Sequence, residues 1–154
     1  FRRVLFRSAH VAKWSFPVRV VTGDAPKYAA FRAARAALAA SGTVTLELAL
    51  AQVPTVVAYK VSRIEEFVAR RLVTVPFIAL PNLLLEEKVV PEFIQDDCSP
   101  DQLSEALLPL LHGGEARAAQ IGAFARLDAV MQAGADNAPS ANAARAVLAM
   151  ARRA

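Results

Sequence analysis

The sequence predicts an α/β fold: a Rossmann-like parallel sheet with flanking helices, followed by a helical carboxyl-terminal segment. Short apolar runs alternate with helix-like segments between residues 16 and 82, as in βαβ units. Residues 53–59 are almost continuously apolar, which is typical of a strand covered on both faces. Beyond residue 99 the apolar residues recur at helical spacing.

Size and composition fit one globular domain. The chain has 154 residues, of which 55% are hydrophobic and 21% charged, which excludes a disordered chain. Its single cysteine, Cys98, excludes an internal disulfide framework and fits a reducing compartment. No uninterrupted apolar run reaches the roughly 18 residues of a membrane span.

The charge distribution argues against a nucleic-acid partner. The net charge is +4, but residues 1–40 carry eight Lys and Arg against one acid, while residues 41–154 carry ten against thirteen. No basic stripe interleaved with aromatic residues follows the basic first quarter. We therefore expect no nucleic-acid binding.

Residues 1–15 are set apart from the fold. The first ten hold three arginines and no acid, and they lack the apolar centre of a secretory signal. We interpret residues 1–15 as a non-native or truncated leader, and residues 16–154 as the domain.

The first elements surround a short turn. Residues 17–21 are a β-branched run that predicts a strand, and 22–26 have turn chemistry. Residues 27–35 have the spacing of a short helix. Residues 36–40 could extend that helix or form a strand of small residues. We favour the strand, because it places the following turn at a strand's carboxyl end.

That turn, Ser41-Gly42-Thr43, opens a helix predicted over 43–52. Gly42 permits positive φ and close backbone approach, and Ser41 or Thr43 can cap the helix. Backbone N–H groups at the positive end of a helix suit a phosphate or diphosphate. Glu47, one turn further on, is placed to accept hydrogen bonds from sugar hydroxyls. The alternative is that the turn is only a helix cap.

Further along, a strand is predicted over 53–59, a helix with a capping box from Ser62 to about residue 72, and a strand over 76–80 ended by Pro81-Asn82. Ligands in such sheets bind at the carboxyl ends of the strands. Ser41, Tyr59-Lys60 and Asn82 all occupy such positions in this interpretation.

Three polar residues after the last predicted strand are further candidates. The Asn82 amide could recognise a base or phosphate, and Glu92 and Gln95, one helical turn apart, could face the same cleft. A plain Pro-Asn turn and a solvated helix start are the alternatives. The basic side chains Lys60, Arg63, Arg70 and Arg71 are either a solvated face or contacts for anionic lipid or diphosphate.

The remainder is predicted to be helical. Ser99 caps a helix that begins with Pro100 and reaches about residue 111. Two more helices are predicted over 115–132 and 140–151.

Several kinds of chemistry are disfavoured. His10 and His112 are far apart without ligand-type neighbours, so no metal site is expected. Ser41 has no histidine partner for a hydrolase triad. Cys98 follows Asp96 and Asp97, whose charges disfavour a nucleophilic thiolate.

Four motifs in this order resemble one family: Ser-Gly-Thr-x-Thr-Leu-Glu from residue 41, Val-Pro-x-Val-Val-Ala-Tyr from 53, Leu-Pro-Asn from 80 and Val-Pro-Glu-Phe-x-Gln from 90. With Pro-Ser-Ala-Asn-Ala-Ala-Arg-Ala-Val-Leu near the end, they resemble the carboxyl-terminal half of lipid-A-disaccharide synthases. These are inverting glycosyltransferases with the two-domain GT-B fold. The resemblance covers roughly residues 17–154.

The resemblance implies transfer of 2,3-diacylglucosamine from UDP onto 2,3-diacylglucosamine 1-phosphate, giving lipid A disaccharide 1-phosphate and UDP, without a cofactor. Residues 16–154 would then be the nucleotide-sugar donor-binding domain. Ser41, Gly42 and Thr43 would hold the diphosphate and Glu47 the ribose, while Asn82, Glu92 and Gln95 would complete the donor site. The implied location is cytoplasmic, peripheral at the inner membrane of a Gram-negative bacterium.

Two departures from the family pattern bear on function. Leu85-Glu86-Glu87-Lys88 stands where many members have a Gly-Arg element, which puts a phosphate contact there in doubt. The amino-terminal domain, expected to supply acceptor binding and the general base, is absent. The chain is therefore expected to be inactive alone, with an unknown catalytic base, and to form a homodimer or adhere to membranes through bare apolar surface.

Alternative functions are another GT-B transferase, a UDP-sugar epimerase domain, or a non-catalytic α/β interaction module whose Ser-Gly-Thr turn is only a cap.

Overall fold

The computed structural model describes residues 10–61, 76–131 and 139–151. The chain divides after residue 33 into two units, each described by itself below. The helix predicted over 62–72, with Ser62, Arg63, Arg70 and Arg71, lies outside the described residues.

The first unit contains the helix α2 (Asp24–Ala33), which confirms the helix predicted over 27–35. Asp24 lies in the first turn, where a carboxylate complements the helix dipole, and it pairs with Lys27 at 3.3 Å. The strand predicted over 17–21 is wrong, because these residues have no regular structure and pair with none of the described strands. A β-branched run gains strand geometry only from a hydrogen-bonded neighbour.

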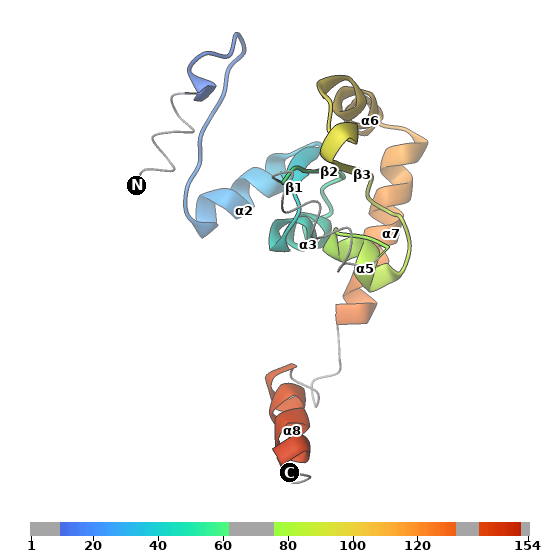
Figure 1. The fold of residues 1–154 in the computed structure, drawn as a ribbon. Helices are drawn as coiled ribbons and strands as arrows, with labels where there is room; N and C mark the ends of the chain where they lie inside the picture. The colour runs from blue at the N-terminus through green and yellow to red at the C-terminus, as the bar shows by residue number, and fades with distance from the viewer. Residues whose placement is uncertain (1–9, 62–75, 132–138, 152–154) are drawn as a thin grey trace. The chain divides into compact units, whose positions relative to one another are not determined.

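The second unit contains the sheet and its helices (Figure 1). In chain order its elements are β1 (Ala37–Ala40), α3 (Thr43–Leu50), β2 (Thr55–Tyr59), α5 (Leu80–Leu85), β3 (Glu92–Ile94), a short 3₁₀ turn (Gln95–Asp97), α6 (Pro100–His112), α7 (Glu115–Met131) and α8 (Pro139–Ala151). The strands and helices predicted over 36–40, 43–52, 53–59, 99–111, 115–132 and 140–151 are thereby confirmed.

The described strands form a parallel sheet in the order β1-β2-β3. Ala37 pairs with Thr55, and Val57 pairs with Glu92. The central strand is covered on both faces, since Val56 and Val57 have no exposed surface. The sheet and its helices confirm the predicted Rossmann-like α/β fold.

Helices cover both faces of the sheet. α3, α5 and α7 pack together, and α6 packs against β2 from the other side (Figure 1). The core joins Ala49 of α3 and Val57 of β2 to Phe124 and Leu127 of α7, all without exposed surface. This packing fixes the strand ends that carry the candidate site.

Two arginines join the start of β1 to the end of α6. The Arg35 side chain donates to the carbonyls of Leu111 and His112, and Arg117 donates to the carbonyl of Arg35. Cations at a helix carboxyl terminus complement its dipole and its unpaired carbonyls. Arg117 also donates to the carbonyl of Leu110 at 3.4 Å.

Residues 76–95 depart from the prediction. The strand predicted over 76–80 is wrong: residues 76–79 are irregular, and α5 begins at Leu80 with Pro81 in its first turn. Asn82 therefore lies in a helix, not at the end of a strand. Glu92 and Gln95 are not one helical turn apart either, because Glu92 begins β3 and Gln95 follows it.

The apolar run 76–80 is too short for its period to distinguish strand from helix start, and a Pro at a helix's second position favours the helix. Among the described helices, none is both long and apolar enough to cross a bilayer.

Candidate functional site

The turn after β1 presents bare backbone. Gly42 is the N-cap of α3 with φ 145° and ψ −170°, a conformation that residues with a Cβ rarely adopt. The Thr45 hydroxyl donates to the Gly42 carbonyl at 2.8 Å and fixes the first helical turn. A Cβ added to Gly42 would meet no described atom within 4 Å, so its outer side is open.

The first turn of α3 favours an anion. Gly42 and Thr43 are exposed, no side chain caps the helix, and its first turn has no acidic residue. The positive end of the helix dipole is therefore not neutralised by the helix's own side chains. Glu47 lies one turn further along, with its side chain half-buried.

Ser41 is tied to a distant part of the chain. Its hydroxyl donates to the carbonyl of Ile78 at 2.9 Å. Ser41 therefore joins the carboxyl end of β1 to the segment that leads into α5.

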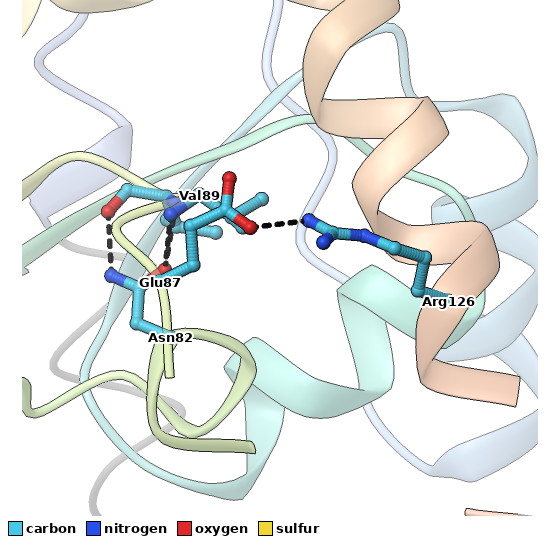
Figure 2. A network of polar contacts seen from close by, with 5 residues as sticks. Asn82, Glu87, Val89 and Arg126 are labelled. Carbon is cyan, nitrogen blue, oxygen red and sulfur yellow. Dashed lines mark hydrogen bonds and ion pairs between the residues drawn. The ribbon is translucent and has the colours of Figure 1, made fainter. Parts of the chain in front are cut away.

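Asn82 has no exposed surface, and its amide binds main-chain groups of the loop that follows α5 (Figure 2). Its Oδ1 accepts from the N–H groups of Val89 and Val90 at 2.9 and 2.8 Å. Its Nδ2 donates to the Val90 carbonyl and to Glu92 Oε1, each at 2.8 Å. Asn82 thus holds the loop between α5 and β3 in place, and its buried amide cannot contact a ligand in this structure.

The Glu92 carboxylate accepts from the main chain before α5. Its Oε2 accepts from the Ile78 N–H at 3.0 Å, and its Oε1 accepts from the Ala79 N–H at 2.9 Å. Because α5 has no acid in its own first turn, Glu92 supplies the negative charge at this helix start from β3.

Gln95 fixes the end of β2. It is buried, with φ 54°, and its Oε1 accepts from the Val61 N–H at 2.7 Å while its Nε2 donates to the Val61 carbonyl at 3.3 Å. Gln120 of α7 does the same at the other end, binding the N–H and carbonyl of Thr55 at 2.9 and 3.3 Å.

The seven candidate residues thus fall into two groups. Ser41, Gly42, Thr43 and Glu47 lie on the turn and the start of α3, whereas Asn82, Glu92 and Gln95 bind the backbone of loops around it. Hydrogen bonds through Ile78 link Ser41 to Glu92, and Glu92 binds Asn82 directly.

Sequence reasoning missed Gln120, Arg126 and the backbone of Ile78 and Ala79. Gln120 shares the buried face of α7 with Ala123, Phe124 and Leu127, so a polar residue within an apolar stripe was the available signal. Arg126 pairs with Glu87 at 2.6 Å, as Figure 2 shows, and the sequence carried no signal for it. Within the described part of the chain, no group of three His, Cys, Asp or Glu residues is arranged to hold a metal ion.

Comparison with known proteins identifies the family. The family model described as lipid-A-disaccharide synthetase matches residues 6–146. The chain belongs to the lipid-A-disaccharide synthetase family. The resemblance seen in the motifs is thereby confirmed, and the match begins within the segment 1–15 that was set apart.

Individual members of the lipid-A-disaccharide synthetase family are close in sequence. The chain is 50% identical to the lipid-A-disaccharide synthase of Bradyrhizobium diazoefficiens over 143 residues, which is 93% of this chain and 36% of that protein. It is 49% identical to that of Rhodopseudomonas palustris strain HaA2 over 140 residues, covering 91% and 35%. It is 45% identical to that of Paramagnetospirillum magneticum over 143 residues, covering 92% and 36%. The chain thus spans about a third of the length of these relatives.

Proposed function

We propose that residues 16–154 are the nucleotide-sugar donor-binding domain of a lipid-A-disaccharide synthase. The reaction is transfer of 2,3-diacylglucosamine from UDP to 2,3-diacylglucosamine 1-phosphate, with release of UDP. Acceptor binding and the general base belong to the part of the protein outside this chain. Working on acylated sugars would bring the protein to the cytoplasmic face of the inner membrane as a peripheral enzyme.

The observation that carries this proposal is the open turn at the start of α3. Gly42 and Thr43 expose backbone at the positive end of a helix, at the carboxyl end of a parallel strand. An anionic diphosphate is stabilised at such a helix end, and so is the charge that develops on UDP as it leaves. Ser41, Gly42 and Thr43 are therefore assigned to the diphosphate.

Glu47 is assigned to the ribose. It lies on the same helix one turn beyond Thr43, and a carboxylate accepts hydrogen bonds from two neighbouring hydroxyls. The site is completed by side chains that hold its backbone, those of Asn82, Glu92 and Gln95. Their hydrogen bonds to the chain support this role.

Calorimetric titration of UDP into the chain tests the proposal. We expect Glu47→Ala to weaken binding by about tenfold or more, the loss of a hydrogen bond to a charged group. Glu105→Ala, which removes an exposed carboxylate from α6, is the matched control and should leave the affinity unchanged.

A folded chain that does not bind UDP would overturn the donor-binding role. Equal binding by the wild type and Glu47→Ala would remove Glu47 from the site. Thymidine diphosphate and guanosine diphosphate are useful competitors, because displacement of UDP by both would show an anion site without uridine selectivity.

A further inference from the structure

The carboxylate of Glu92 lies at the centre of a hydrogen-bond chain that ends at the donor turn. It accepts from two consecutive main-chain N–H groups, Ile78 and Ala79, and from the amide of Asn82, at 2.8 to 3.0 Å. Hydrogen bonds to an ionised acceptor are stronger than neutral ones. Glu92 therefore fixes the peptide at 78–79 relative to β3.

The same peptide holds Ser41. While the Ala79 N–H of this peptide is bound by Glu92, its Ile78 carbonyl accepts from the Ser41 hydroxyl at 2.9 Å. β1 and β3 are not neighbours in the sheet, since β2 lies between them. The chain Glu92–Ile78–Ser41 thus connects the two outer described strands without passing through the strand ladder.

The turn depends on such a connection because Gly42, at its centre, allows many backbone conformations. Gly42 has the widest choice of backbone conformation of any residue type, so its neighbours must select one. Thr45 fixes the helical side of Gly42, and Ser41 fixes the strand side.

We propose that Glu92 is a positioning residue for the donor turn. Through Ile78 it fixes Ser41, and so sets the direction of the Gly42 and Thr43 N–H groups, without itself contacting the nucleotide. This role rests on the proposed donor-binding function for its effect on UDP, whereas the coupling between Glu92 and the turn is a property of the chain alone.

A double-mutant cycle tests the proposal on the full 154-residue chain, with Glu92→Gln, Ser41→Ala and the double variant. Glu92→Gln keeps the side-chain shape but replaces one acceptor oxygen by a donor, which opposes one of the three donors. Backbone amide resonances are recorded by NMR for each variant, and UDP affinity is then measured on the same samples.

Each single variant is expected to shift the Gly42 and Thr43 resonances and to weaken UDP binding about tenfold. If both act through one link, the double variant loses about tenfold as well, whereas independent effects would multiply to about a hundredfold. Glu87→Gln is the matched control: Glu87 is an exposed carboxylate near the same loop, and its loss should leave both readouts unchanged.

Unmoved Gly42 and Thr43 resonances in Glu92→Gln, or losses that multiply in the double variant, would overturn the proposal. If wild type fails to bind UDP while the resonances move as expected, the donor-binding function fails and the coupling stands. If Glu92→Gln does not fold, the reciprocal measurement decides. Ser41→Ala should then shift the Ile78 and Ala79 resonances, and unchanged resonances would overturn the proposal.

Discussion

Asn82 shows how one buried side chain can hold an irregular loop in place. Its amide binds both N–H groups and one carbonyl of Val89 and Val90, and also the Glu92 carboxylate. A buried amide is tolerated only when its donors and acceptors are matched. The surrounding groups therefore require both an acceptor oxygen and a donor nitrogen at this position, which an asparagine amide supplies.

Asn82→Asp should destabilise the chain by roughly 2–5 kcal/mol at neutral pH. The change replaces a donor by an acceptor facing the Val90 carbonyl and the Glu92 carboxylate, which leaves a buried charge opposed. Urea unfolding measures the difference between variant and wild type.

The loss should depend on pH. Burial beside Glu92 raises the pKa of the introduced carboxyl above its usual value of about 3.9. The penalty is then smallest below pH of about 4 and grows as pH rises through the raised pKa of the folded state. Asn142→Asp on α8, where Asn142 is exposed, makes the same charge change as a control. Equal losses for both variants would contradict the buried network.

The sequence indicated which polar residues of this region matter, but not which groups they bind. Asn82, Glu92 and Gln95 were recognised as candidates, yet their hydrogen bonds join residues up to 34 positions apart. Local pattern carries no information on which distant backbone group a side chain will meet. The turn at Gly42 was predictable, because a glycine next to Ser and Thr indicates a turn and a helix start from the local sequence alone.

At the scale of elements, the end of α6 depends on cations supplied from elsewhere. Its last carbonyls, at Leu110, Leu111 and His112, accept from Arg35 and Arg117. Gly113 ends the helix with φ 90°, and a Cβ there would lie 3.2 Å from Arg35. These hydrogen bonds therefore fix the start of β1 against the end of α6.

Arg117→Ala should lower the free energy of unfolding by about 1–3 kcal/mol, because it leaves carbonyls at a partly buried helix end without their charged donor. Arg126→Ala is the matched control on the same helix. Its ion pair with Glu87 has both side chains more than half exposed, at 52% and 56%, so its loss should cost under about 1 kcal/mol. Thermal unfolding of the two variants distinguishes them, and equal shifts in Tm would contradict this account.

The elements predicted correctly were those with a local cause. Helix α6 has a Ser99 cap, α7 buries apolar residues at helical spacing, and β2 has a long apolar run. The elements that failed were short: the apolar runs 17–21 and 76–80 and the segment at β3, which is three residues long. A strand of three residues exists because β2 is beside it, not because of its own composition.

At the scale of the whole molecule, α7 holds the second unit together. Phe124 and Leu127 have no exposed surface and pack with residues of α3 and β2 and with the chain around α5. The residues that carry the donor turn and those that carry Glu92 therefore share one core.

Phe124→Ala should cost roughly 3–5 kcal/mol, the loss of a large buried side chain together with the cavity left behind. Met131→Ala near the end of the same helix is the control, because Met131 is 46% exposed and should change stability little. Chemical denaturation followed by circular dichroism measures both. A small effect of Phe124→Ala would mean that the core repacks around the gap.

The side-chain contacts also differ in the chain entropy lost when each one closes its loop. The Asn82–Val90 contact closes a loop of 8 positions, the Gln95–Val61 contact 34, and the Gln120–Thr55 contact 65. Each doubling of loop length adds about 0.6 kcal/mol to the entropy of closure. Of these three contacts, Asn82–Val90 is thus the least costly in chain entropy to close and Gln120–Thr55 the most costly, and the Arg117–Arg35 contact, 82 positions apart, costs more still.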